Sequence, residues 1–183
     1  MKALIIVDML NDFVRKDGKL YVEGAEEIIG NIKRLKEAFK EAGLPVIYTN
    51  DSHLPNVDKE LKLWGEHAVR GSEGAQVVEE LKPEEGDYVV TKRRYSAFFS
   101  TDLDLLLREL GVREVVLTGV ATNVCVLHTA ADAFFRGYEV TVVSDGTMSV
   151  PKEDQGKWLE YMKTVYGARI ASSEELVKEL SRT

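Results

Sequence analysis

The chain has 183 residues, 44% of them hydrophobic, and a formal net charge of −7 at pH 7. A chain of this length can build one hydrophobic core, so we expect a single domain over residues 1–183. The negative charge argues against a protein that binds nucleic acid, and no apolar run approaches the roughly 20 residues that cross a membrane.

The cysteine content and the N-terminus indicate where the protein works. Cys125 is the only cysteine, so no internal disulfide can form, which is typical of the reducing cytoplasm. The apolar run Ala3–Val7 ends at an acidic residue and is too short for a signal peptide. We therefore expect a cytoplasmic protein. Charged residues at 30% with only two glutamines also fit a thermophile.

Short apolar runs alternate with helical patterns along the chain. The predicted strands are Ala3–Val7, Pro45–Thr49, Asp87–Val90, Glu114–Thr118, Tyr138–Val143 and Ala168–Ala171. The predicted helices are Glu23–Ala42, Gly74–Leu81, Thr101–Leu110, Asn123–Arg136, Lys152–Tyr166 and one that begins at Ser173. We expect Asn50–Ser72 to be a long loop, and loops of that length are usually functional.

This alternation predicts the fold class. Strands that are separated by helices form a parallel sheet, and right-handed crossovers place the helices on both of its faces. The sequence therefore predicts a three-layer α/β fold with six parallel strands and a Rossmann-like topology. No G-x-G-x-x-G or P-loop motif indicates a nucleotide site, and no G-x-S-x-G motif indicates a serine hydrolase.

Polar and reactive side chains follow the ends of four predicted strands. They are Asp8, Asp51 with His53, Lys92, and Cys125. In an open α/β sheet, ligands bind outside the carboxyl ends of the strands, near the change in strand order. We therefore expect these residues to converge on one site.

Cys125, Asp8 and Lys92 together have the residue types of a nucleophilic site. Cys125 follows a strand near the start of a helix, where unpaired N–H groups lower a thiol pKa. An isolated cysteine is more often a small buried hydrophobic residue, so Cys125 alone does not indicate a catalytic site. A carboxylate at Asp8 can take the thiol proton, and a buried Lys92 can stabilise the developing negative charge. Backbone N–H groups between Ala121 and Cys125 could form an oxyanion hole.

A second set of residues indicates a metal. Asp51, His53 and His67, fourteen residues after His53, are the ligand types of a mononuclear site. Without Asp51 beside them, two surface histidines would be the simpler interpretation. Phe13 and Trp64 are close in sequence to these groups and could be walls for a flat ligand, although core packing explains most aromatic residues.

Three segments carry a family resemblance: Ala3–Phe13 (ALIIVDMLNDF), Lys92–Leu107 (KRRYSAFFSTDLDLLL) and Gly119–Asp132 (GVATNVCVLHTAAD). They resemble the isochorismatase-like cysteine hydrolases, and the likeness extends to about Tyr166. The resemblance implies a six-stranded parallel sheet between helices.

The resemblance also implies roles for individual residues. The family's catalytic triad would be Asp8, Lys92 and Cys125. A cis peptide bond would join Val120 and Ala121, and the N–H groups of Ala121 and Cys125 would form the oxyanion hole.

Within the family, the chain resembles the nicotinamidases, while its Gly119–Cys125 and Tyr95–Phe99 segments look equally like N-carbamoylsarcosine amidases and ureidoacrylate amidohydrolases. The likeness to the nicotinamidases implies Asp51, His53 and His67 as ligands of a divalent metal, with zinc expected first and iron or manganese as alternatives. We expect no further His or Glu ligand from the stretch between the two histidines. The substrate-binding residues would be Phe13, Trp64 and Tyr95.

The resulting hypothesis is a cysteine amidohydrolase that converts nicotinamide to nicotinate and ammonia through a thioester, a reaction of NAD salvage. The likeness also implies a homo-oligomer acting on a small-molecule amide. One alternative is a metal-free amidohydrolase of the N-carbamoylsarcosine or ureidoacrylate type. Another is a non-catalytic module for ligand binding or thiol sensing.

Overall fold

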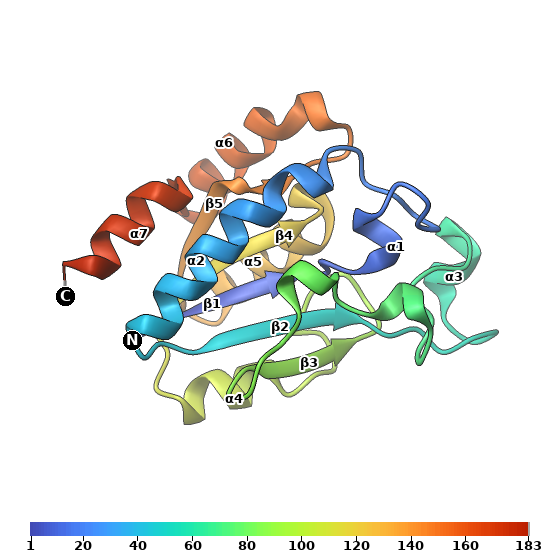
Figure 1. The fold of residues 1–183 in the computed structure, drawn as a ribbon, viewed down its shortest axis with the longest axis horizontal. Coiled ribbons are helices and arrows are strands. Elements are labelled where there is room, and N and C mark those ends of the chain that lie inside the picture. The colour runs from blue at the N-terminus through green and yellow to red at the C-terminus, as the bar shows by residue number, and fades with distance from the viewer. Residues whose placement is uncertain (183) are drawn as a thin grey trace.

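The computed structural model describes residues 1–182 and contains one parallel sheet of six strands (Figure 1). The strands are β1 (Lys2–Val7), β2 (Val46–Asp51), β3 (Tyr88–Lys92), β4 (Glu114–Val120), β5 (Glu139–Met148) and β6 (Arg169–Ala171). Their order is β3-β2-β1-β4-β5-β6, and each neighbouring pair is parallel. This confirms the predicted six-stranded parallel fold.

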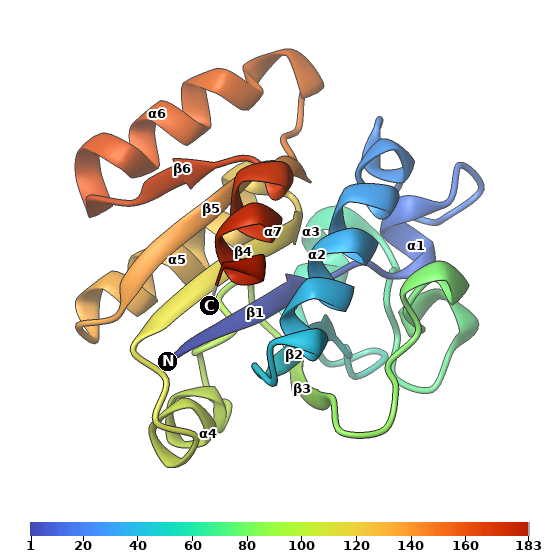
Figure 2. The same ribbon diagram turned by 60° about the vertical axis from the view of Figure 1, so that its left-hand side comes forward.

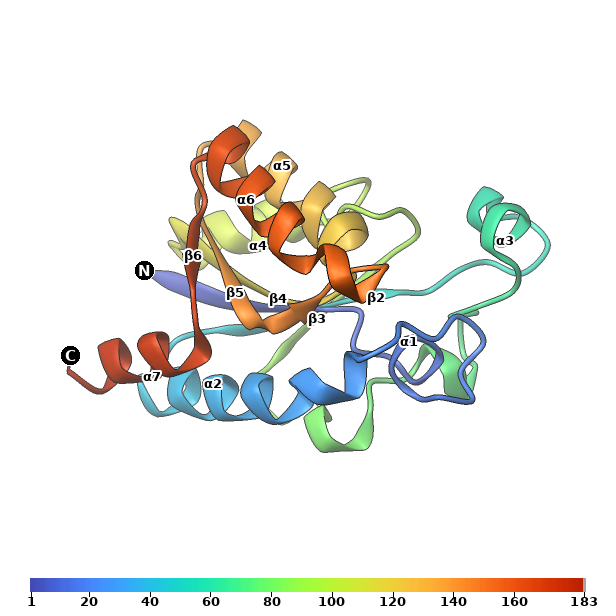
Figure 3. The same cartoon turned by 90° about the horizontal axis from the view of Figure 1, so that it is seen from above.

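Helices cover both faces of the sheet (Figure 2). The helices on the faces are α2 (Ile29–Glu41), α4 (Leu103–Glu109), α5 (Leu127–Phe135), α6 (Gln155–Tyr166) and α7 (Ser173–Ser181). The short helices α1 (Asn11–Val14) and α3 (Lys59–Trp64) lie beyond the carboxyl ends of the strands (Figure 3). Helices α2 and α7 lie on one face, whereas α4, α5 and α6 lie on the other (Figure 3). In the described range 1–182, no helix combines the length and the apolarity needed to cross a bilayer.

Burial explains why the central strands are apolar throughout. Five residues of β1, Ala3–Val7, have no exposed surface, because alternate side chains enter the two cores on opposite faces. Helix α2 presents one apolar stripe to the sheet, formed by Ile29, Ile32, Leu35 and Phe39. The sheet is therefore rigid at its centre, where β1 pairs with both β2 and β4.

The change in strand order lies between β1 and β4. From β1 the chain builds outward through β2 to β3, and from β4 it builds the other way through β5 to β6. Crevices at the carboxyl ends of strands around such a point are the usual ligand sites of this architecture.

Two predictions of local structure are wrong. The stretch Asn50–Ser72 is not a plain loop, because it contains the short helix α3. Gly74–Leu81 is not a helix but two separate 3₁₀ turns, Glu73–Ala75 and Glu79–Leu81. The backbone between these turns is extended instead, because Val77 forms an antiparallel bridge with Leu10 and the N–H of Val78 donates to Met9.

Gly119 allows β4 to pass close to the end of β1. Its φ is +106°, and a Cβ atom there would lie 2.0 Å from the carbonyl oxygen of Val7. Since Asp8 follows Val7, this close contact also sets the position of the site described below.

We expect Gly119→Ala to lower the free energy of unfolding by about 2–4 kcal/mol, from unfavourable φ and overpacking together. Gly43→Ala is the matched control, because Gly43 also has a positive φ but has open space around its Cβ position. That variant should lose only about 1–2 kcal/mol. Urea denaturation of both variants measures the difference, and equal losses would contradict the role of the close contact.

Candidate active site

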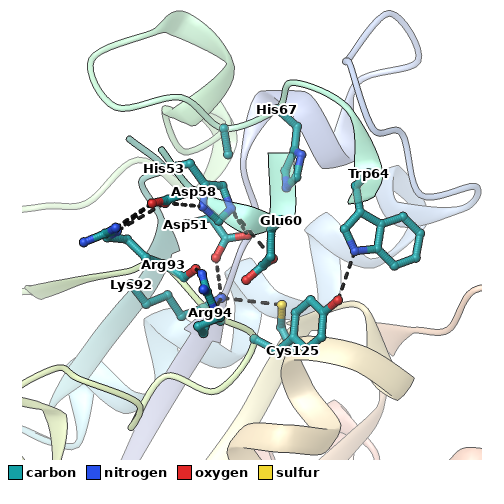
Figure 4. Close-up of polar contacts among 12 residues, drawn as sticks. Asp51, His53, Asp58, Glu60, Trp64, His67, Lys92, Arg93, Arg94 and Cys125 are labelled. Carbon is teal, nitrogen blue, oxygen red and sulfur yellow. Dashed lines mark hydrogen bonds and ion pairs between the residues drawn. The ribbon is translucent and has the colours of Figure 1, made fainter. Parts of the chain in front are cut away.

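A buried lysine lies at the centre of the site (Figure 4). Lys92 is the last residue of β3, and its ammonium donates to Asp8 Oδ2 at 2.9 Å and to Asp51 Oδ1 at 2.6 Å. The same nitrogen lies 3.4 Å from Cys125 Sγ and 3.2 Å from the carbonyl oxygen of Arg94. The structure therefore brings together the acid, the ammonium and the sulfur that the sequence analysis selected.

Asp8 directly follows β1 and has the chemistry of a general base. Its φ of +52° turns the chain sharply after the strand, and its Oδ1 accepts the backbone N–H of Asp51 at 2.7 Å. Burial and the nearby Asp51 carboxylate raise the pKa of Asp8 to about 6, although Lys92 opposes this shift. At neutral pH the carboxylate is therefore mostly ionised and still basic enough to take a proton.

Cys125 lies in a π-helical turn, Thr122–Val126, between β4 and α5. Side chains of the turn tie it to the segment after β5. Thr122 donates to Gln155 Oε1 at 2.7 Å, and the Asn123 amide forms two hydrogen bonds with the backbone of Val150, at 2.7 and 3.0 Å. These bonds fix the turn of Cys125 to the segment that follows β5.

The expected lowering of the Cys125 pKa by a helix N-terminus is wrong. Burial raises the pKa of the thiol well above its usual value, the carboxylates of Asp8 and Asp51 add to this, and Lys92 opposes it. The resting group is therefore a neutral thiol. It needs a base to become a nucleophile, and the Asp8 and Asp51 carboxylates and Cys125 Sγ lie within 4.8 Å of one another.

A second cluster adjoins the first and has the composition of a metal site. Ligand atoms of Asp51, His53, Glu60 and His67 all lie within 4.8 Å of one another, and all four residues are buried. Two nitrogen and two carboxylate ligands suit a divalent transition metal.

Unpartnered atoms support that interpretation. His53 Nε2 and Glu60 Oε2 are buried and have no hydrogen-bond partner among residues 1–182. Buried polar atoms are normally paired, and a divalent cation would satisfy both. The Nδ1 atom of each ring already has an acceptor, Asp58 for His53 at 2.9 Å and the Gly65 carbonyl for His67 at 2.7 Å. The residues present therefore fit a metal.

Glu60 was missed by the sequence analysis, and the expectation of no further ligand between His53 and His67 is wrong. Glu60 is the second residue of α3, a helix too short to give a clear periodic pattern. Burial and the Asp51 carboxylate raise the pKa of Glu60 to about 7. A divalent cation would favour its ionised form.

Asp51 belongs to both clusters. Its Oδ1 accepts from Lys92, while its Oδ2 lies 3.5 Å from His53 Nε2. The cluster around Lys92 and the possible metal-binding cluster are therefore parts of one continuous polar site.

A cavity of about 210 Å³ opens onto these groups. Its lining includes Cys125, Asp8, Asp51, Glu60, His67, Val120, Ala121 and the three aromatic residues expected to bind substrate, Phe13, Trp64 and Tyr95. Trp64 Nε1 donates to the Tyr95 hydroxyl at 3.0 Å, as Figure 4 shows. The bond between Val120 and Ala121 is a cis peptide.

Comparison with known proteins identifies the family. Residues 2–175 match the isochorismatase domain, so the chain belongs to the isochorismatase family. It is 41% identical to N-carbamoylsarcosine amidase from Thermoplasma acidophilum, with a TM-score of 0.87 over 94% of this chain and 96% of the other. It is 36% identical to nicotinamidase PncA from Bacillus subtilis, with a TM-score of 0.88 over 93% of this chain and 99% of the other. It is 34% identical to pyrazinamidase of Pyrococcus horikoshii, which was solved in complex with zinc, with a TM-score of 0.86 over 93% of this chain and 98% of the other. The chain is thus a hydrolase of amides.

We expect Asp8→Asn to lower kcat by about 10²–10⁴-fold, because the neutral thiol of Cys125 then lacks its base. Asp132→Asn is the control, since Asp132 is half-buried on α5, forms an i,i+4 ion pair with Arg136 and does not line the cavity. Ammonia release should be measured on whichever of nicotinamide and N-carbamoylsarcosine the wild type cleaves faster. An Asp8→Asn enzyme that keeps wild-type kcat would refute the assignment.

Proposed function

We propose that this isochorismatase-family hydrolase deamidates nicotinamide to nicotinate and ammonia. The observation that carries the proposal is the buried cluster of Asp51, His53, Glu60 and His67 beside the cavity that contains Cys125. Cysteine hydrolysis of an amide needs no metal, so a metal site at the cavity wall indicates substrate orientation. If nicotinamide is the substrate, the reaction belongs to cytoplasmic NAD salvage.

The charge of the cavity favours a neutral substrate. Within residues 1–182, the lining includes three acids, Asp8, Asp51 and Glu60, and no lysine or arginine. Lys92 beneath the cavity and a bound divalent ion would together balance these three charges. A substrate with its own carboxylate would lack a cationic partner there, whereas nicotinamide is uncharged.

The shape of the cavity favours a flat ring. Phe13 and Trp64 both line it, and Phe13 also packs against His67 with ring centroids 5.7 Å apart. Aromatic walls bind a planar ligand through stacking and apolar contact. Zinc suits the two imidazoles and two carboxylates, with iron or manganese as alternatives. When bound, the metal would supply a Lewis-acidic centre that orients the pyridine nitrogen.

The proposed reaction proceeds through a thioester. Asp8 accepts the proton of Cys125 Sγ, and the thiolate attacks the carboxamide carbon. The N–H groups of Ala121 and Cys125 stabilise the oxyanion, while the C–N bond breaks and Asp8 returns the proton to the departing ammonia. A water that Asp8 deprotonates then attacks the thioester, which releases nicotinate and regenerates the thiol. Lys92 stabilises the negative charge throughout.

A second candidate is a metal-independent amidohydrolase that cleaves an N-carbamoyl amino acid or ureidoacrylate. The 41% identity to N-carbamoylsarcosine amidase favours it. A thiol-sensing or binding module is the weakest alternative, because a sensor does not need an acid and an ammonium beside the sulfur. We also propose that the chain forms a homo-oligomer.

We expect purified protein to release ammonia from nicotinamide, and Cys125→Ala to abolish this. Chelation with EDTA should lower kcat/KM by about 10²-fold, because the substrate loses its orienting contact, and added Zn²⁺ should restore it. Metal analysis of the EDTA-treated protein must confirm that the metal has been removed. Full activity of the metal-free protein, or activity only on N-carbamoyl substrates, would favour the second candidate.

We expect Trp64→Leu to raise KM for nicotinamide by about 3–10-fold with a smaller effect on kcat, because one wall of the ring site is lost. Phe99→Leu is the matched control, since Phe99 is exposed and does not line the cavity. Steady-state kinetics of both variants decide the point. Equal KM values for the two variants would argue against a stacking role.

A further inference from the structure

The Nδ1 atom of His53, which faces away from the possible metal ligands, contacts Asp58, a residue that has no role in the proposed function. His53 Nδ1 lies 2.9 Å from Asp58 Oδ2, and the same oxygen accepts the N–H of Leu54 at 3.1 Å. Asp58 directly precedes α3, and its side chain has no exposed surface. A carboxylate in this position can only accept, so His53 donates its Nδ1–H.

Arg93 neutralises this buried carboxylate. Its Nη2 and Nε donate to Asp58 Oδ1 at 2.6 and 2.9 Å in a two-pronged contact. Arg93 directly follows Lys92, so consecutive residues at the end of β3 serve the two clusters. Lys92 contacts Asp8 and Asp51. Arg93 instead contacts Asp58, the partner of His53 Nδ1, as Figure 4 shows.

The inner nitrogen of His53 is the one left for a metal. His53 Nε2 lies 3.5 Å from Asp51 Oδ2 and 3.9 Å from Glu60 Oε1, and it has no hydrogen-bond partner. If the proton moved to Nε2, that atom would lose the lone pair that binds a metal. The Asp58 contact favours the other tautomer and makes the ring a stronger ligand.

We propose that Asp58 and Arg93 are positioning residues for the metal: Asp58 fixes the tautomer and orientation of His53, and Arg93 holds Asp58 in place. This inference rests on the metal site of the proposed function. It assigns no contact with the substrate to either residue.

The test measures metal affinity directly. Zn²⁺ competition against a chromophoric chelator should show about 10–100-fold weaker binding by Asp58→Asn. Arg93→Gln should weaken binding in the same direction, and Arg93→Lys should lie between it and wild type, because lysine keeps the charge without the planar two-pronged contact. The Co²⁺ absorption spectrum should also change in Asp58→Asn.

Two controls separate this role from general damage. Arg94→Gln changes the neighbouring arginine, which donates only to the carbonyl oxygen of Arg93, and should not weaken Zn²⁺ binding. The rate at which iodoacetamide alkylates Cys125 in the metal-free protein should stay within about twofold of wild type in every variant, because the contacts of Asp58 and Arg93 do not include the sulfur.

The outcomes are distinguishable. Wild-type affinity in both Asp58→Asn and Arg93→Gln would overturn the inference and leave the metal site intact. A wild-type protein that binds neither Zn²⁺ nor Co²⁺ would overturn the metal site and the inference together. Zn²⁺ binding that depends on Asp58 without turnover of nicotinamide would support the inference and reject only the proposed substrate. If Asp58→Asn does not fold, the Zn²⁺ affinity of Arg93→Gln decides whether the inference holds.

Discussion

The buried ammonium of Lys92 is the interaction on which the site depends. Taking a charge out of water costs several kcal/mol, and only close, well-oriented partners offset that cost. Lys92 has two such partners, Asp8 and Asp51, at 2.9 and 2.6 Å. Lys92 ends β3, Asp51 ends β2, and Asp8 directly follows β1. These three strands are neighbours in the sheet. The strand order therefore creates the cluster, and the ammonium in turn fixes both carboxylates beside Cys125.

The two carboxylates share one lysine but have different roles. Both are fully buried, which by itself raises a carboxyl pKa. For Asp8 burial prevails, and the Asp51 charge adds to it, so the pKa is raised to about 6. For Asp51, Lys92 and His53 together outweigh burial and hold its pKa below the usual value. These opposite shifts favour Asp8 over Asp51 for the proposed proton transfer, and they leave Asp51 ionised, as the proposed metal ligand must be.

The residues at strand ends and the two histidines were predictable from sequence, whereas the residues that support them were not. Asp8 and Lys92 interrupt or follow apolar runs, so the parallel fold alone places them at one edge. Glu60 and Asp58 were missed because α3 has only six residues and a carboxylate in a polar stretch looks like any surface acid. Arg93 was missed because, in the run Lys92-Arg93-Arg94, it looks like an ordinary solvated arginine. The direction of the Cys125 pKa was missed because a sequence shows a helix end but not how deeply the sulfur is buried.

The proposed reacting groups and most of the proposed metal ligands come from different parts of the chain, with Asp51 common to both. The strand ends and the turn of Cys125 supply the carboxylate of Asp8, the ammonium of Lys92 and the thiol. The stretch from residue 53 to residue 67 supplies two histidines, Glu60, Asp58 and the Trp64 wall. Because this stretch lies outside the sheet, its sequence can change without moving the strands. Relatives whose names specify different amide substrates keep TM-scores of 0.86–0.88 to this chain at 34–41% identity, as expected where one fold carries different binding sites.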